Sequence, residues 1–241
     1  MEYRFDIGPV LYQDSVPIHP HIRKPELNQL LASVGSNALE LVLQNLDVYL
    51  DKALPQNENE STLAPKICPE MSHVHWESQS AETIYNLYRG LSGQFKLKTN
   101  YMGRTVDLDS IAIFTSEESK CTCTMHPGHL IRQEVSKETN FDTYYDSPVM
   151  VHVKDLPNSA VLSPGHIHYS DGLLCVKCSR LDDVEDPKQN WIFVRKVKIG
   201  TKWMSANDFR NGFLSKPLAT SCFESILMDL RTELSDSKTL G

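Results

Sequence analysis

The chain has 241 residues, of which 40% are hydrophobic and 23% are charged, and its formal net charge is −7. This composition is typical of a globular protein with its own core and excludes an intrinsically disordered chain. The acidic balance excludes a generally basic nucleic-acid coat, although it is compatible with a local basic patch. The sequence contains no apolar run of about 18 residues, so it predicts no membrane-spanning helix.

Residues 1–54 predict one strand followed by two helices. The strand is expected at 10–18, where Pro17 ends it or confines it to an edge. Pro25 opens a helical pattern, and Gly35 is expected to break that pattern into two helices. The two helices share a wide apolar face that nothing in residues 1–60 is large enough to cover. The face either packs on the later domain or belongs to a domain whose beginning lies outside these residues.

Residues 55–72 are expected to be a linker, because 55–62 are polar and show no periodicity. Beyond residue 73, Ser80 is expected to cap a short helix, Ser205 a second one, and 222–230 to form a C-terminal helix. Strand-like runs occur at 95–101, 105–114, 148–153, 161–162, 173–178 and 191–199. Several short strands separated by turn residues predict a small barrel or sandwich. The polar stretch at 115–145 is expected to be an insertion of unassigned role, and 233–241 a flexible tail.

A basic segment near the end of this domain is a candidate nucleic-acid contact. Residues 188–202 contain five cations and no acid: Lys188, Arg195, Lys196, Lys198 and Lys202. Trp191 and Trp203 flank the last four, and aromatic rings can stack on bases while cations bind phosphates. The alternative is a solvated strand edge, where lysine discourages aggregation. Lys96, Lys98 and Arg104 are weaker candidates on the first strands.

The cysteines and histidines do not predict a metal site. Cys175 and Cys178 have C-x-x-C spacing, but in a strand their side chains would point to opposite faces, so buried thiols are expected instead. A second group has irregular spacing in a polar segment and is not expected to bind zinc: Cys121, Cys123, His126 and His129.

Three segments in this order resemble the methionyl-tRNA formyltransferase family, most closely its mitochondrial animal form. They are R-F-D-I-G-P-V at 4–10, the stretch from A-P-K-I at 64–67 to I-Y-N-L-Y-R at 84–89, and M-S-A-N-D-F-R-N-G at 204–212. The resemblance implies an α+β chain. Residues 1–54 would be the C-terminal remnant of an α/β formyltransferase catalytic domain, and 73–232 an OB-like β-barrel domain.

The resemblance also implies a reaction. The family transfers a formyl group from 10-formyltetrahydrofolate to the amino group of methionyl initiator tRNA, in mitochondrial translation initiation for the animal form. Asp6 would be the catalytic carboxylate that orients a histidine. The family's Asn and His lie upstream of this turn and are absent from these 241 residues, so the chain alone is expected to be inactive.

Partners and location follow from the same resemblance. Initiator methionyl-tRNA is expected to contact Lys196, Lys198, Arg195 and Lys202, and no metal, DNA or membrane partner is expected. The complete protein is expected to be a mitochondrial monomer. The alternative function is a non-catalytic tRNA-binding module or short isoform.

Overall fold

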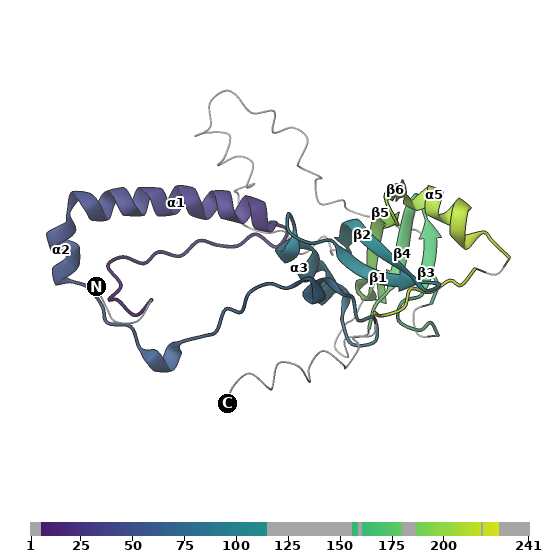
Figure 1. Cartoon of the computed structure of the whole chain (residues 1–241), viewed down its shortest axis with the longest axis horizontal. Helices are drawn as coiled ribbons and strands as arrows, with labels where there is room; N and C mark the ends of the chain where they lie inside the picture. The colour runs from purple at the N-terminus through teal and green to yellow at the C-terminus, as the bar shows by residue number, and fades with distance from the viewer. Residues whose placement is uncertain (1–5, 115–155, 159–160, 180–186, 218, 227–241) are drawn as a thin grey trace, which may run out of the picture. The chain divides into compact units, whose positions relative to one another are not determined.

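Figure 1 shows the computed structural model, which describes residues 6–114, 156–158, 161–179, 187–217 and 219–226. Within this part, residues up to Ile67 form one compact unit and residues from Cys68 onward form a second. No helix in the described part is long and apolar enough to cross a membrane. The strand expected at 148–153, the insertion at 115–145, the group at 121–129 and the tail at 233–241 lie outside the described residues.

The first unit contains two consecutive helices, α1 (Lys24–Gln44) and α2 (Leu46–Asp51), and a short 3-10 turn, η1 (Glu58–Glu60). Pro25 lies in the first turn of α1, and the backbone N–H of Arg23 donates to Glu26 Oε2 at 2.8 Å. The break expected at Gly35 is wrong, because α1 continues through it. One interior glycine costs only about 1 kcal/mol relative to alanine, which the surrounding helix formers outweigh. The break occurs at Asn45 instead.

The strand expected at 10–18 is also wrong. Val10 and Leu54 exchange two backbone hydrogen bonds, of 2.8 and 3.0 Å, but they form an isolated bridge. Tyr12 then contacts Tyr49 edge to face, with ring centroids 6.1 Å apart. A strand needs a neighbour along its length, and the described part of this unit offers only Leu54. The unit therefore has two helices, divided at Asn45 and not at Gly35, and no strand at 10–18.

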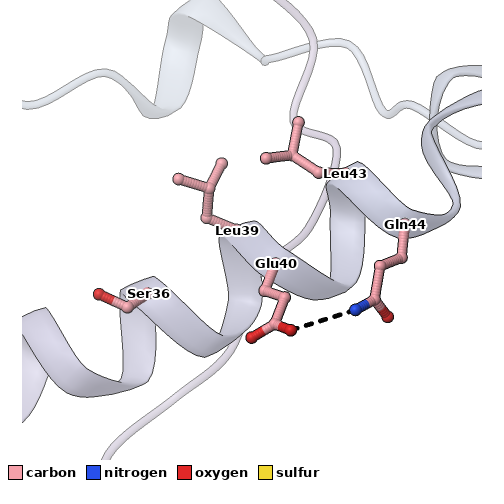
Figure 2. Close-up of a pocket in the computed structure, with 5 residues that line it drawn as sticks. All are labelled: Ser36, Leu39, Glu40, Leu43 and Gln44. Carbon is pink, nitrogen blue, oxygen red and sulfur yellow. Dashed lines mark hydrogen bonds between the residues drawn. The ribbon is translucent and has the colours of Figure 1, made fainter.

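The apolar face of α1 is largely uncovered. Val42 is the only buried residue of this helix, whereas Leu39 and Leu43 are 59% and 61% exposed. A hollow along this side of α1 has a described lining from that helix alone: Ser36, Leu39, Glu40, Leu43 and Gln44 (Figure 2). Exposed apolar surface on this scale is typical of a face that meets another surface.

The second unit is an antiparallel sheet with short helices around it (Figure 1). Before the first gap it contains η2 (Pro69–Ser72), α3 (Ala81–Leu91), β1 (Leu97–Tyr101) and β2 (Arg104–Ile113). Later come β3 (Ile167–Ser170), β4 (Leu173–Lys177), η4 (Pro187–Asn190), β5 (Trp191–Ile199), β6 (Lys202–Ser205), α5 (Ala206–Phe209) and a π-helical turn, η5 (Arg210–Leu214). Four of the expected strands are confirmed; the one expected at 161–162 is wrong, and β3 and β6 were not expected.

The strand order is β1-β2-β5-β4-β3, and the long β5 pairs with β6 as well. A short segment at 221–224 bonds to both ends of this path. Asn100 on β1 exchanges two 2.9 Å backbone hydrogen bonds with Glu224, and the Ile167 N–H on β3 donates to the Ser221 carbonyl at 2.7 Å. The sheet thus closes on itself, as expected for a small barrel. Because these edges need partners, 222–224 is extended, and the helix expected to start at Cys222 is wrong there.

Aromatic side chains pack where the 221–224 segment closes the sheet. Trp76 stacks on Phe223 with ring centroids 6.0 Å apart, and Tyr101 meets Phe209 at 5.1 Å. The indole N–H of Trp76 donates to Thr99 Oγ1 at 2.8 Å, so this buried polar group is satisfied. Both predicted helix caps are confirmed: the Ser80 hydroxyl accepts from the Thr83 N–H, and the Ser205 hydroxyl from the Asp208 N–H.

Candidate nucleic-acid interface

The register of four strands places lysines on one face of the sheet. Lys98 is opposite Asp107, Asp107 is opposite Lys198, and Lys198 is opposite Trp203. Residues directly opposite one another in a ladder share a face, so these four form a row across β1, β2, β5 and β6. Lys196 precedes Lys198 by two residues and therefore lies on the same face in the next row.

Lys96, just before β1, joins this group through its long side chain. Its Nζ lies 2.8 Å from Asp109 Oδ2 and 6.0 Å from the centroid of the Trp203 ring. The Nζ of Lys198 lies 5.8 Å from the same ring. Both distances fall at the outer limit of cation–π attraction, so the indole holds two ammonium groups near it. We call the following set the lysine face: Lys96, Lys98, Lys196, Lys198 and Trp203.

Carboxylates moderate the charge of the lysine face. Asp109 pairs with Lys96, and Asp107 Oδ2 lies 3.4 Å from Lys198 Nζ. Glu70 also interacts electrostatically with Lys98, so four lysines against three carboxylates leave a net charge of +1. Lys196 is exposed, and its side chain makes no hydrogen bond or ion pair with the described residues. Its ammonium group is the one most available to an incoming anion.

Two of the four expected contact residues lie elsewhere. Arg195 alternates with Lys196 along β5 and therefore belongs to the other face. Lys202 is opposite Ile199, one position along from the pair that contains Trp203, so it is also on the other face. The structure brings together Lys196 and Lys198 but separates them from Arg195 and Lys202.

The two tryptophans that flank the basic segment, Trp191 and Trp203, differ in solvent exposure. Trp191 is 1% exposed and packs in a core cluster, so its ring cannot stack on a ligand. Trp203 is 39% exposed. Of the pair, only Trp203 can offer a ring to a partner.

The basic segment at 188–202 does not reveal the acidic partners of the lysine face, because Asp107 and Asp109 lie on the neighbouring strand. Lys96 and Lys98, the weaker candidates of the sequence, lie with Lys196 and Lys198. The available signal was the period-two repeat of K-x-K at 96–98 and D-x-D at 107–109, which sends like residues to one side of each strand. The sequence did not reveal which strands pair or in which register.

Asp6 lies in the first unit, in the turn that contains Gly8. Its φ is +61°, in the left-handed region that aspartate tolerates better than most residues. The amide of Gln56 fastens this turn, because its Nε2 donates to the carbonyls of Asp6 at 3.1 Å and Gly8 at 2.6 Å. The Asp6 side chain is exposed. An exposed carboxylate on a fastened turn can orient a donor such as an imidazole.

The thiols of the C-x-x-C pair are inert. Cys175 and Cys178 are fully buried, as expected, and burial raises the pKa of each thiol to about 12. Both therefore remain protonated at neutral pH and are poor metal ligands or nucleophiles. In the described ranges, no three His, Cys, Asp or Glu side chains are grouped so that they could hold a metal ion.

Comparison with known proteins gives the family. Residues 66–214 match the family described as "Formyl transferase, C-terminal domain". The chain belongs to this family. The match spans β1 to η5 and includes the whole lysine face, whereas Asp6 precedes the matched residues.

Relatives of this formyl transferase family member extend the similarity. The chain is 30% identical over 211 residues to the mitochondrial methionyl-tRNA formyltransferase of Homo sapiens, which covers 88% of this chain and 44% of that enzyme. The bacterial methionyl-tRNA formyltransferase of Moorella thermoacetica is 37% identical over 92 residues, 38% of this chain and 29% of that enzyme. The chain thus spans less than half the length of these relatives.

Among solved structures, HypX from Aquifex aeolicus in complex with tetrahydrofolic acid matches with a TM-score of 0.44 and 15% identity. The match covers 94% of this chain and 32% of that one. The family assignment does not rest on this likeness.

Proposed function

We propose that these residues act as the C-terminal portion of a methionyl-tRNA formyltransferase of the mitochondrial type. The reaction is formyl transfer from 10-formyltetrahydrofolate to the amino group of methionyl initiator tRNA, at the start of mitochondrial translation. One observation supports this above all others: similarity to enzymes of that name runs along 88% of the chain. The mitochondrial location and a monomeric complete protein belong to the same proposal.

Asp6 is the catalytic carboxylate of this proposal. Attack of the amine on the formyl carbon creates a tetrahedral oxyanion, which positioned donors must stabilise while a base removes the proton from nitrogen. A carboxylate serves this step by orienting a histidine, and groups that act as a unit lose nearly all their effect when separated. Asp6 has no such Asn–His segment before it within these 241 residues.

The formyl donor is not assigned to the described residues. The hollow on α1 has a described lining from one helix, which cannot surround a folate (Figure 2). We therefore expect these residues alone not to transfer a formyl group. Incubation of the purified chain with 10-formyltetrahydrofolate and charged initiator tRNA should yield no formylmethionyl-tRNA. Sustained turnover would contradict the role given to the upstream segment.

The lysine face is the tRNA contact of this proposal. Its charge exceeds that of its acidic partners, and Lys196 is free among the described residues to bind a phosphate. Binding without catalysis is the second candidate function, favoured by the fact that the whole lysine face lies within this chain. Both candidates require tRNA affinity; formyl transfer by a longer form separates them.

The binding test is a salt titration of the affinity for initiator tRNA, from about 50 to 200 mM salt. Lys196→Ala and Lys198→Ala should each weaken binding and reduce the slope of log affinity against log salt by about 1. Lys216→Ala is the matched control, because Lys216 is exposed and contacts Phe213 rather than the lysine face. Equal losses in all three variants would mean that tRNA senses overall charge and not this face.

A further inference from the structure

Trp203 is the unusual member of the lysine face. The chain has three tryptophans, and all lie in the second unit. Trp76 and Trp191 are 0% and 1% exposed, whereas Trp203 is 39% exposed. Trp203 thus gives up part of the burial that stabilises the other two. Its position therefore calls for a role outside the core.

The surroundings of Trp203 bring like charges together. The ammonium groups of Lys96 and Lys198 lie 6.0 and 5.8 Å from the ring centroid. Lys96 directly precedes β1 and Lys198 is on β5, and these two strands flank β2. Two cations near one ring repel each other, and Asp109 and Asp107 offset that repulsion by pairing with one lysine each. The result is a partly exposed aromatic ring with two ammonium groups about 6 Å from its centroid, each of them paired with an aspartate.

This arrangement matches the chemistry of a nucleotide. A base offers a flat π-face to an indole, and the phosphates beside it are anions for the two lysines. A paired helix cannot make this contact, because its bases are stacked on each other inside the duplex. Aromatic side chains bind bases that are splayed out of a helix, in loops, bulges and ends.

We propose that Trp203 stacks on an unpaired base of RNA while Lys96 and Lys198 bind the adjoining phosphates. This inference rests on the proposed function, in which the lysine face contacts tRNA. It adds the ligand class: the face reads a single-stranded nucleotide, not the phosphate backbone of a paired stem alone.

Tryptophan fluorescence tests the stacking directly. Because Trp76 and Trp191 are buried, quenching by added RNA reports on Trp203. A short single-stranded RNA should quench the emission of the chain, whereas a blunt duplex of the same sequence should bind more weakly and quench little. Trp203→Phe should abolish the quenching and retain part of the affinity, because phenylalanine keeps a smaller ring.

Trp203→Ala should lower the affinity for the single strand by about 5- to 150-fold, the loss of one stacked base. Met102→Ala is the matched control, since Met102 is an exposed apolar side chain in the turn between β1 and β2. It should bind like the unaltered chain. The thermal midpoint of each variant shows whether the fold survives, and the quenching of the unaltered chain decides the question even if Trp203→Ala fails to fold.

The outcomes separate this inference from the proposed function. Binding without quenching, or equal affinity for duplex and single strand, overturns the stacking role. The proposed tRNA contact then still stands if Lys196→Ala weakens tRNA binding. Absence of any RNA binding overturns both.

Discussion

Gly165 controls the closure of the sheet in the second unit. Its φ is +84°, its N–H donates to the Lys177 carbonyl at 2.7 Å, and its carbonyl accepts from the Phe223 N–H at 2.9 Å. A β-carbon at this position would overlap the carbonyl oxygen of Phe223, which is backbone and cannot rotate away. Gly165→Ala should therefore push the 221–224 segment off the sheet.

The expected loss of unfolding free energy in Gly165→Ala has two parts. The left-handed φ costs an L-residue roughly 1–2 kcal/mol. Displacing the segment loses the Phe223–Gly165 hydrogen bond and strains the Ile167–Ser221 bond, at about 0.5–1.5 kcal/mol each. The free energy of unfolding should fall by about 2–5 kcal/mol, and Tm by roughly 5–15 °C for a domain of this size.

Gly172→Ala is the matched control. Gly172 has a φ of +78°, but no heavy atom lies within 4 Å of a β-carbon built there. Gly172→Ala should lower the free energy of unfolding only by the backbone cost of the left-handed φ, about 1–2 kcal/mol. Unfolding is followed by tryptophan fluorescence, since all three tryptophans lie in the second unit. Equal losses in the two variants would refute the claim that the 221–224 segment closes against Gly165.

Three further predictions concern charge and burial. At about pH 8, Cys175 and Cys178 should resist a thiol reagent in the folded chain and react after unfolding, because burial raises the pKa of both thiols to about 12. Labelling is measured by mass spectrometry of the peptides, and fast labelling of the folded chain would contradict this prediction. Asp107→Asn should strengthen RNA binding about two- to fivefold, because it removes the carboxylate beside Lys198; weaker binding would mean that Asp107 mainly positions that lysine. Burial lowers the pKa of His166, so the unfolded chain takes up its proton first, and the free energy of unfolding should fall as the pH drops below about 6.5; in His166→Gln this part of the pH dependence should disappear from urea titrations.

Much of the second unit could be predicted from the sequence, because its signals are local. The β5 range was predicted to the residue, and the caps at Ser80 and Ser205 were read from side chains that bond within their own first turn. The helix predicted to start at Cys222 was wrong at 222–224 for the opposite reason. Its conformation is set by Asn100 on β1 and by His166 just before β3, both distant in sequence, which no local pattern reveals.

The candidate site was predicted only in part. Lys196 and Lys198 were named as candidate contacts together with Arg195 and Lys202, and these four residues were not sorted by face from the sequence. The acids that pair with the face, and the approach of Lys96 to Trp203, depend on strand register across β1, β2, β5 and β6. The separation of Arg195 from Lys196, by contrast, follows from alternation within β5 alone.

The most direct test of the account is amine footprinting with and without initiator tRNA. Lysines of the purified chain are acetylated briefly, and each site is quantified by mass spectrometry. The account predicts that tRNA protects Lys196 and Lys198 strongly, while Lys52 in the first unit and Lys216 remain as reactive as before. Protection at Lys52 or Lys216 instead, under conditions where the chain binds tRNA, would contradict the assignment of the lysine face.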